Sequence, residues 1–209
     1  MNPDSPIVFV VDDDFRVRES LCSLISSMGL QVAVFGSAAE FLECEKPDAP
    51  ACLILDLQLP GTNGLELQQQ LAIGEAPPIV FISGHGDIPS SVRAIKAGAI
   101  EFLSKPFSEQ ELMQAISNAI TIDRIARQKR TELAELRRHY SHLTPREREV
   151  LPFVVGGYAN KVTAADLGTA EITIGVHRGQ IMRKMEAKSL AELVRMADKL
   201  GVSRTTKAV

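Results

Sequence analysis

Polar side chains suited to phosphoryl chemistry follow four short apolar runs of the sequence. They are Asp12, Asp13 and Asp14, then Asp56, then Ser83, and finally Lys105. Carboxylates that converge on one point repel one another, and a divalent cation relieves that repulsion. Mg²⁺ prefers a few carboxylates together with water. Because a lysine and a serine hydroxyl beside such an ion suit a phosphoryl group, the residue types indicate Mg²⁺-assisted phosphoryl transfer.

These side chains meet only if the apolar runs are neighbouring strands. Strand-like and helix-like segments alternate over residues 6–107, which predicts an α/β fold, a parallel sheet with helices on both faces. The expected strands are Ile7–Val11, Gln31–Phe35, Cys52–Leu55, Ile79–Ile82 and Ile100–Leu103, and helices are expected around 17–28, 38–44, 63–73, 88–97 and 108–122. Ligands bind at the carboxyl ends of the strands in such sheets. The polar groups are therefore predicted to share one sheet edge.

Four segments, in this order and spacing, resemble the receiver domain of bacterial response regulators: VVDDD, LILDLQLPGTNGLEL, VFISGHGD and EFLSKPF. The resemblance covers about residues 5–122 and implies a five-stranded flavodoxin-like fold. It also implies that a partner sensor histidine kinase phosphorylates Asp56. By the same match, Mg²⁺ (or Mn²⁺) takes its ligands from Asp12, Asp13, Asp56 and the backbone carbonyl of Gln58.

The resemblance to receiver domains also implies a switch. Ser83 matches the switch hydroxyl, Lys105 the phosphate-pairing lysine and Phe102 the aromatic switch residue. A new phosphoryl group is expected to draw Ser83 toward it, and the vacated space lets Phe102 turn inward. Asp14 is expected to face solvent, and no catalytic residue is predicted.

The N-terminal part of the chain is acidic and the C-terminal part is basic. Residues 1–123 hold 6 Lys and Arg against 17 Asp and Glu, residues 124–140 hold 6 against 2, and residues 141–209 hold 11 against 7. This asymmetry predicts two domains with different partners. We expect a first domain over 1–122, a helical linker over 123–140 and a second domain over 141–209. The linker is expected to be solvated, with dimer contact through its second half as the alternative.

The second domain has the signals of a helix-turn-helix. Thr144 and Glu147 form a capping-box pattern at a helix start. Two short amphipathic segments, 159–167 and 171–186, are joined by a turn at Gly168. Helix, glycine turn and helix in a basic domain predict a DNA-binding helix-turn-helix.

The segments LTPREREVL, GGYANK, AADLG and VHRGQIMRKM resemble the LuxR-type DNA-binding domain. A receiver followed by this domain is the FixJ/NarL architecture, so the resemblance covers nearly the whole chain. It implies a four-helix domain whose recognition helix, about 171–186, enters the major groove of double-stranded DNA. The residues that match positions near DNA are Asn160, Lys161, Val176, His177, Arg178, Arg183 and Lys184. The arginines and lysines are expected mostly at phosphates.

Five residues of this domain depart from the LuxR-type pattern. Pro152 falls inside the first helix, where it costs about 3 kcal/mol unless the helix kinks. Thr163 replaces a usual apolar core residue, and Ala170 replaces the usual Ser or Thr cap. Gly175 and Gly179 lie inside the recognition helix, each about 1 kcal/mol less favourable than Ala. We therefore predict a marginal recognition helix with reduced direct base readout.

The predicted function is that of a cytoplasmic two-component response regulator, which dimerises on phosphorylation and regulates transcription. One alternative is a phospho-dependent protein-interaction adaptor with a weakened DNA-binding domain. The other is a Mg²⁺-dependent aspartyl-phosphate phosphatase, which would need a second aspartate at position 58, where the sequence has Gln58. The apolar runs are far shorter than the roughly 20 residues of a membrane span, and MNPDSP shows no signal-peptide pattern. No membrane partner is therefore expected.

Overall fold

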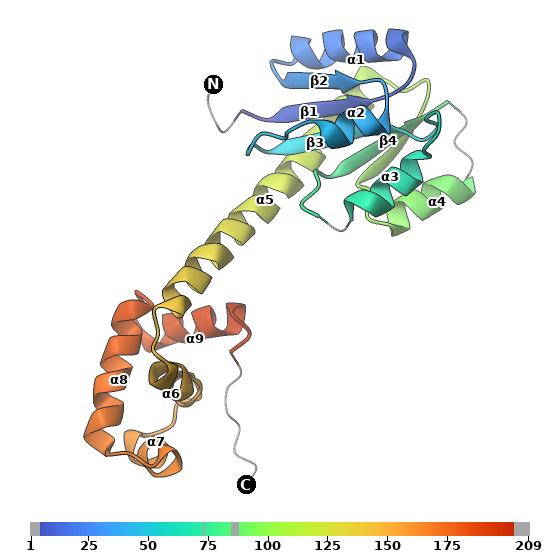
Figure 1. The fold of residues 1–209 in the computed structure, drawn as a ribbon. Helices are drawn as coiled ribbons and strands as arrows, with labels where there is room; N and C mark the ends of the chain where they lie inside the picture. The colour runs from blue at the N-terminus through green and yellow to red at the C-terminus, as the bar shows by residue number, and fades with distance from the viewer. Residues whose placement is uncertain (1–4, 73, 85–87, 203–209) are drawn as a thin grey trace. The chain divides into compact units, whose positions relative to one another are not determined.

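The computed structural model describes residues 5–72, 74–84 and 88–202. The chain folds into two compact units, Met1–Arg127 and Gln128–Val209, which we call unit 1 and unit 2 (Figure 1). The division falls inside the predicted linker, and the predicted limits 1–122, 123–140 and 141–209 stay a prediction. Of the segment VFISGHGD, positions 85–87 lie outside the described residues.

Unit 1 is built on a five-stranded parallel sheet with strand order β2-β1-β3-β4-β5. Its strands are β1 (Ile7–Val11), β2 (Gln31–Phe35), β3 (Ala51–Asp56), β4 (Ile79–Ser83) and β5 (Glu101–Ser104), and its helices are α1 (Phe15–Ser27), α2 (Ala38–Glu43), α3 (Gly64–Leu71), α4 (Ile88–Lys96) and the start of α5 (Glu109–Ser141). Val11 pairs with Leu55, and Leu55 pairs with Phe81. The central strands therefore end side by side, and the predicted flavodoxin-like fold is confirmed.

The central strands contribute side chains to two separate hydrophobic cores, because successive residues of a strand point to opposite faces of the sheet. The core beneath α1 and α5 contains Val8, Val10, Cys52, Ile54, Val80 and Ile82. The core beneath α2, α3 and α4 contains Phe9, Val11, Leu53, Leu55 and Phe81. Helices thus cover both faces of the sheet (Figure 1), as the uninterrupted apolar runs predict.

Helix α5 extends well past the sheet and continues into unit 2, as the absence of Pro and Gly predicts. Asp123 fixes its first part within unit 1. The buried carboxylate of Asp123 accepts hydrogen bonds from the Ala51 amide, at 2.8 Å, and from the Arg127 Nε, at 2.9 Å. Arg127 also pairs with Asp48. This attachment was not predicted from the sequence.

Unit 2 contains the end of α5 and, within its described residues, the helices α6 (Pro145–Val155), α7 (Asn160–Leu167), α8 (Glu171–Lys184) and α9 (Leu190–Lys199). Their shared core includes Val150, Leu151, Ile174, Ile181, Met185 and Leu193. Thr144 and Glu147 form the predicted capping box. Gly168 ends α7 with a left-handed φ of 60°, a conformation that favours glycine. The predicted helix-turn-helix is confirmed.

The departures from the LuxR-type pattern are accommodated in different ways. Helix α6 continues through Pro152. Thr163 is buried, and its hydroxyl donates to the Ala159 carbonyl at 3.2 Å. The buried hydroxyl therefore has a hydrogen-bond partner. Helix α8 starts without a side-chain cap, because Ala170 stands at its N-cap. No described helix is long and apolar enough to cross a membrane.

Candidate functional site

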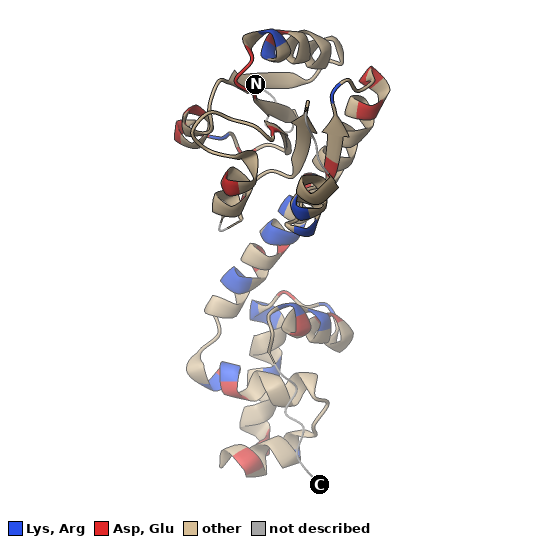
Figure 2. Ribbon diagram, turned by 90° about the vertical axis from the view of Figure 1, so that its right-hand side faces the viewer, with Lys and Arg blue, Asp and Glu red and all other residues tan. Residues whose placement is uncertain are grey.

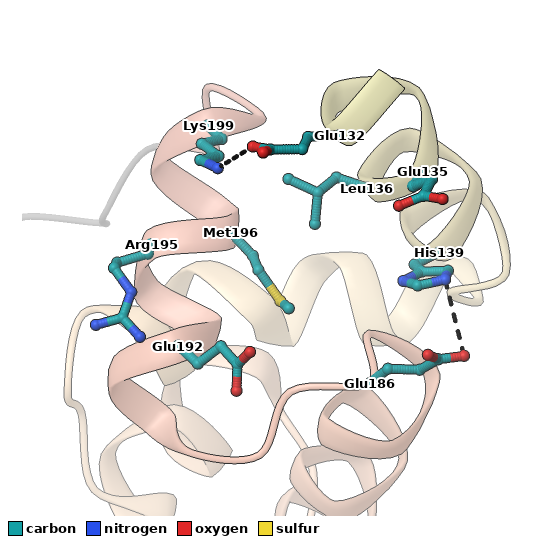
Figure 3. Close-up of a pocket in the computed structure, with 9 residues that line it drawn as sticks. All are labelled: Glu132, Glu135, Leu136, His139, Glu186, Glu192, Arg195, Met196 and Lys199. Carbon is teal, nitrogen blue, oxygen red and sulfur yellow. Dashed lines mark hydrogen bonds and ion pairs between the residues drawn. The ribbon is translucent and has the colours of Figure 1, made fainter. Parts of the chain in front are cut away.

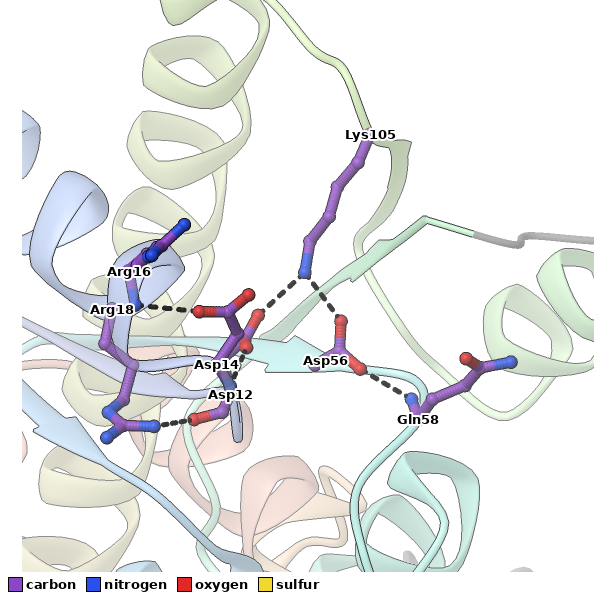
Figure 4. Close-up of polar contacts among 7 residues, drawn as sticks. All are labelled: Asp12, Asp14, Arg16, Arg18, Asp56, Gln58 and Lys105. Atoms are coloured by element: carbon purple, nitrogen blue, oxygen red, sulfur yellow. Dashed lines mark hydrogen bonds and ion pairs between the residues drawn. The ribbon is translucent and has the colours of Figure 1, made fainter.

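The carboxyl edge of the unit 1 sheet gathers four predicted polar residues. Asp12 follows β1, Asp56 and Ser83 end β3 and β4, and Lys105 follows β5. Asp12 and Ser83 are each 1% exposed and Asp56 is 6% exposed. The two carboxylates and the lysine point toward one another across the edge (Figure 4). The prediction that these groups share one sheet edge is therefore confirmed, while their roles stay a prediction.

The Lys105 ammonium connects the two aspartates. It donates to Asp12 Oδ2 at 2.7 Å and to Asp56 Oδ1 at 2.8 Å. Burial raises the pKa of the Asp56 carboxyl above its usual value, although the hydrogen bond and the charge of Lys105 act against that rise. Burial by itself would lower the pKa of Lys105, but its hydrogen bonds to Asp12 and Asp56 outweigh burial and raise it. The lysine charge thus offsets the repulsion between two buried carboxylates.

Backbone amides fix the orientation of both carboxylates. The Asp14 amide donates to Asp12 Oδ1 at 2.8 Å, and the Gln58 amide donates to Asp56 Oδ2 at 2.7 Å. Asp14 is exposed, as predicted, and its side chain also caps α1 by accepting from the Arg16 amide at 2.8 Å (Figure 4). That capping role was not identified from the sequence. The site is therefore held by local turns directly after β1 and β3.

Gly64 packs closely against the backbone that carries Asp56. A Cβ at this position would lie 2.5 Å from the Asp56 carbonyl oxygen and 3.2 Å from the Leu57 Cα. Any other residue would push the backbone that carries Asp56. The sequence segment after Asp56 contained this glycine, but its spacing alone did not reveal so close a contact.

The predicted switch residues lie on β4 and β5. Ser83 is buried at the end of β4, and its carbonyl accepts a hydrogen bond from the Lys105 amide at 2.7 Å. Phe102 is half-buried and stacks on Phe81, with ring centroids 6.2 Å apart. This arrangement joins β4 to β5 next to Asp56.

The carboxyl edge also suits a hard divalent cation. Asp12 and Asp56 present carboxylate oxygens that keep lone pairs beyond the hydrogen bonds they already accept, and Asp13 is exposed beside them. Within residues 5–72, 74–84 and 88–202, no three histidine, cysteine or acidic side chains are grouped to hold a metal ion by themselves. Two buried carboxylates beside the exposed Asp13 fit Mg²⁺, which usually binds through one or two carboxylates and keeps several waters.

The residues predicted near DNA are divided between exposed and engaged positions in unit 2. Lys161, Val176 and Arg183 are exposed, while Asn160 and His177 are half-buried. Basic residues recur along α5 as well (Figure 2). The exposed positions are available to a partner of unit 2, so their predicted role stays a prediction.

Two of the predicted phosphate contacts have partners in unit 2 outside α8, and Arg183 donates to Gln180 within α8. The Lys184 ammonium donates to Glu147 Oε2 at 2.7 Å, and the Glu147 side chain is 5% exposed. Arg178 donates to the Tyr158 carbonyl at 3.1 Å. Lys184 therefore joins α8 to α6, and Arg178 joins α8 to the loop between α6 and α7. The sequence does not reveal these roles.

The end of α5 packs within unit 2 and is not fully solvated. Leu136 is 9% exposed, and Glu132 accepts a hydrogen bond from Lys199 of α9 at 2.9 Å. A pocket of about 470 Å³ lies between these helices (Figure 3). His139 lines it, with Nε2 3.7 Å from the Glu186 carboxylate. The second half of the predicted linker thus contributes to the packing of unit 2.

Comparison with protein families agrees with this description. Residues 8–117 match the response regulator receiver domain, and residues 141–197 match the bacterial regulatory proteins of the luxR family. The chain belongs to the response regulators. It is a two-component response regulator with a LuxR-type DNA-binding domain, a transcription regulator rather than an enzyme. A receiver domain implies a histidine kinase partner, and generally uses Mg²⁺ for phosphorylation, while the LuxR-type domain implies DNA.

Similar proteins cover nearly the whole length of this response regulator. It is 50% identical to nodulation protein W of Bradyrhizobium diazoefficiens, over 94% of this chain and 87% of that protein. It is 44% identical to the transcriptional regulatory protein FixJ of Azorhizobium caulinodans, over 96% of each chain. Among solved structures, the response regulator StyR matches with 49% identity and a TM-score of 0.83, over 93% of this chain and 99% of that one.

Proposed function

We propose that Asp56 is the phosphoacceptor of this response regulator and that a sensor histidine kinase supplies the phosphoryl group. The observation that supports this assignment is the shared Lys105 ammonium, which lies 2.8 Å from Asp56 and 2.7 Å from Asp12. A nucleophilic carboxylate, a second acid and a cation at one sheet edge are the groups that phosphoryl transfer requires.

In the proposed transfer, an Asp56 oxygen forms a bond to phosphorus while the P–N bond of the kinase phosphohistidine breaks. The leaving imidazole keeps the electron pair of that bond and takes up a proton. Lys105 favours the anionic form of Asp56 before attack, because it lowers the pKa that burial raises. After attack, the Lys105 ammonium is free to turn from the former carboxylate to the phosphoryl oxygens.

Mg²⁺ (or Mn²⁺), held by Asp12, Asp13, Asp56 and the main-chain carbonyl of Gln58, would stabilise the negative charge of the transferring phosphoryl oxygens. Asp12 is oriented for this role by the Asp14 amide. Asp13 lies exposed beside it and is free to turn toward the ion.

The same edge provides the proposed switch. Ser83 donates its hydroxyl hydrogen to a phosphoryl oxygen, and Phe102 then turns inward from its position against Phe81. A local change of charge thereby selects between two packing arrangements of β4 and β5. The phosphorylated protein forms a homodimer and binds double-stranded DNA in the cytoplasm, with two domains on paired half-sites. The proposed DNA contacts are those at Asn160, Lys161, Val176, His177, Arg178, Arg183 and Lys184.

The phosphoacceptor is tested with a small phosphodonor such as acetyl phosphate. The wild-type chain should gain one phosphoryl group by intact mass when Mg²⁺ is present, and Asp56→Asn should gain none. Asp48→Asn, which changes an exposed aspartate of the same unit, is the matched control and should react like wild type. Phosphorylation of Asp56→Asn at the wild-type rate would refute the assignment.

The switch is tested by light scattering on the same samples. Phosphorylated wild type should have twice the mass of the unphosphorylated chain, whereas Asp56→Asn should be unchanged by the donor. Equal masses for phosphorylated and unphosphorylated wild type would refute phosphorylation-dependent dimerisation.

The second candidate is an adaptor whose helix-turn-helix unit contacts protein instead of DNA. It is favoured by the absence of a side-chain cap at α8 and by the two glycines inside this helix. Titration of phosphorylated protein against duplex DNA at several salt concentrations separates the two functions, since phosphate contacts weaken steeply with salt. Sequence-selective binding excludes the adaptor, and absence of binding at low salt excludes the DNA function.

A further inference from the structure

One exposed row of α8 carries no charge over two turns. Ile172, Gly175, Val176 and Gly179 are spaced i, i+3, i+4 and i+7, so they lie on one face of the helix. Ile172 is 80% exposed and Val176 is 58% exposed, and both glycines are exposed as well. We call these four residues the outer stripe.

The fold does not require the two glycines of the outer stripe. Neither has a positive φ. A Cβ at Gly179 would meet nothing within 4 Å, and a Cβ at Gly175 would meet only Asn160 Nδ2, at 3.7 Å. Because glycine is less favourable than alanine inside a helix, both positions reduce the stability of α8 without relieving any contact in unit 2.

Exposed cations border the outer stripe on two sides. Arg183 follows Gly179 by one turn on the same face and is exposed. Lys161 is exposed at the start of α7, next to Asn160, whose amide lies beside Gly175. Arg183 donates to Gln180 of the same helix and stays exposed, whereas Arg178 is held by the Tyr158 carbonyl. An uncharged strip between cations complements the DNA major groove, where base edges lie between rows of phosphates.

We propose that the outer stripe reads thymine. In this proposal, which rests on the DNA-binding function proposed above, Ile172 and Val176 contact the 5-methyl groups of thymine. Gly175 and Gly179 let the backbone of α8 come close to the base edges. Recognition of guanine usually needs Arg or Lys, and the outer stripe has neither. The half-site beneath α8 is therefore rich in A·T pairs, with thymines where the stripe touches it.

The first test begins with selection of binding sites from random duplexes by the full-length, phosphorylated protein. Each thymine of the selected half-site is then replaced singly by deoxyuridine, which removes only the methyl group. Loss of one buried methyl should weaken binding about fourfold. Val176→Ala should bind more weakly and should lose the sensitivity to deoxyuridine at its own position. Val34→Ala, an exposed valine of β2, is the control and should keep the wild-type pattern.

The outcomes separate this inference from the function on which it rests. Failure to select any sequence would contradict the proposed DNA function itself. Selective binding with a G·C core, or with no response to deoxyuridine, would overturn thymine readout and leave DNA binding intact. If the outer stripe instead contacts a protein or a second copy of the chain, Val176→Ala should change the measured mass and not the DNA affinity, which also overturns the inference.

The close approach of α8 is tested with Gly179→Ala. The added methyl enters open space in the free protein, so the thermal midpoint of unit 2 should rise and misfolding cannot explain a loss of binding. Affinity for the selected site should fall severalfold, while affinity for unrelated duplex should stay at the wild-type value. Equal or tighter binding of Gly179→Ala to the selected site would overturn the close approach.

Discussion

The carboxyl edge of unit 1 and the outer stripe of unit 2 use charge in opposite ways. At the edge, Asp12, Asp56 and Lys105 are joined by contacts of 2.7 and 2.8 Å and are largely removed from water. On the outer stripe, the exposed side chains are the aliphatic groups of Ile172 and Val176. The proposed phosphoryl site thus concentrates charge, whereas the proposed surface for base edges has its exposed cations at the margins.

The difference extends to the basic residues and glycines of each region. Lys105 serves the unit 1 site directly, while Lys184 of α8 is used inside unit 2 to pair with Glu147. Gly64 is required by the backbone that carries Asp56, whereas Gly179 faces open space. Lysine and glycine therefore have different roles in the two units, and substitutions at these positions test that difference.

The largest effect is expected from Gly64→Ala. The new Cβ would lie 2.5 Å from the Asp56 carbonyl oxygen, so the backbone must move and the free energy of unfolding of unit 1 should fall by about 3 kcal/mol. Phosphorylation by acetyl phosphate should slow in parallel. Gly74→Ala is the matched control, since a Cβ there meets nothing within 4 Å. Equal stability of the two variants in urea, followed by circular dichroism, would contradict this account.

The next largest effect is expected in unit 2 from Lys184→Met. This change leaves the Glu147 carboxylate, 5% exposed, without its ammonium partner. Removing one partner of a buried ion pair is costly, and partial exposure of Lys184 reduces the loss to about 2 kcal/mol. Tyrosine fluorescence is the suitable probe because both tyrosines, Tyr140 and Tyr158, lie in unit 2 and the chain has no tryptophan.

Lys188→Met provides the control for Lys184→Met, because Lys188 is exposed in the same unit. Its effect should stay within about 0.5 kcal/mol. The double variant Glu147→Gln with Lys184→Met should recover part of the lost stability, since it removes the unpaired buried charge. A loss in Lys188→Met as large as that in Lys184→Met would argue against the buried pair.

The contributions of the buried carboxylates Asp56 and Glu147 to the free energy of unfolding should change with pH in opposite directions. Burial acts to raise the pKa of Glu147, but hydrogen bonds from Lys184 and Thr144 hold it below the ordinary 4.5. Its stabilising contribution is therefore complete above pH 4.5 and is lost as the pH falls through the lowered value. Burial raises the pKa of Asp56 above 3.8 despite Lys105, so its contribution is greatest at low pH and is lost as the pH rises.

Substitution of each carboxylate by its amide shows whether that carboxylate stabilises or destabilises its unit at a given pH. At pH 7, Asp56→Asn should stabilise unit 1 and Glu147→Gln should destabilise unit 2, each by roughly 1 kcal/mol. Both differences from wild type should shrink as the pH is lowered toward 3. Hydrogen exchange of each unit in the full chain follows the two effects separately, and the same sign in both units would remove the contrast.

The sequence predicted the site of unit 1 better than the surface of unit 2, for a physical reason. Parallel βα alternation determines which residues emerge at the carboxyl edge, so the strand pattern alone predicts that Asp12, Asp56 and Lys105 lie together. The contact between Asp123 and Ala51 joins residues 72 positions apart, and no periodic pattern indicates it. Such contacts depend on how finished elements pack, which composition and spacing do not encode.

Unit 2 shows the same limit with Glu147 and Lys184. The capping box predicted that Glu147 would accept from the Thr144 amide, which it does at 2.7 Å. The second role of this carboxylate depends on Lys184, which lies 37 positions away on α8. The sequence predicts only a phosphate contact for Lys184, because an isolated lysine in a basic domain has no sequence signal that reveals an internal partner.

A gain in stability of unit 2 is expected from Gly175→Ala. The new Cβ would make only an ordinary contact with Asn160, at 3.7 Å, and alanine is better than glycine in a helix by about 1 kcal/mol. The free energy of unfolding of unit 2 should therefore rise by about that amount, measured by tyrosine fluorescence in urea. A gain means that glycine at an exposed position lowers the stability of α8. A loss would mean that Gly175, like Gly64, is required by packing, and the contrast between the two regions would then fail at this position.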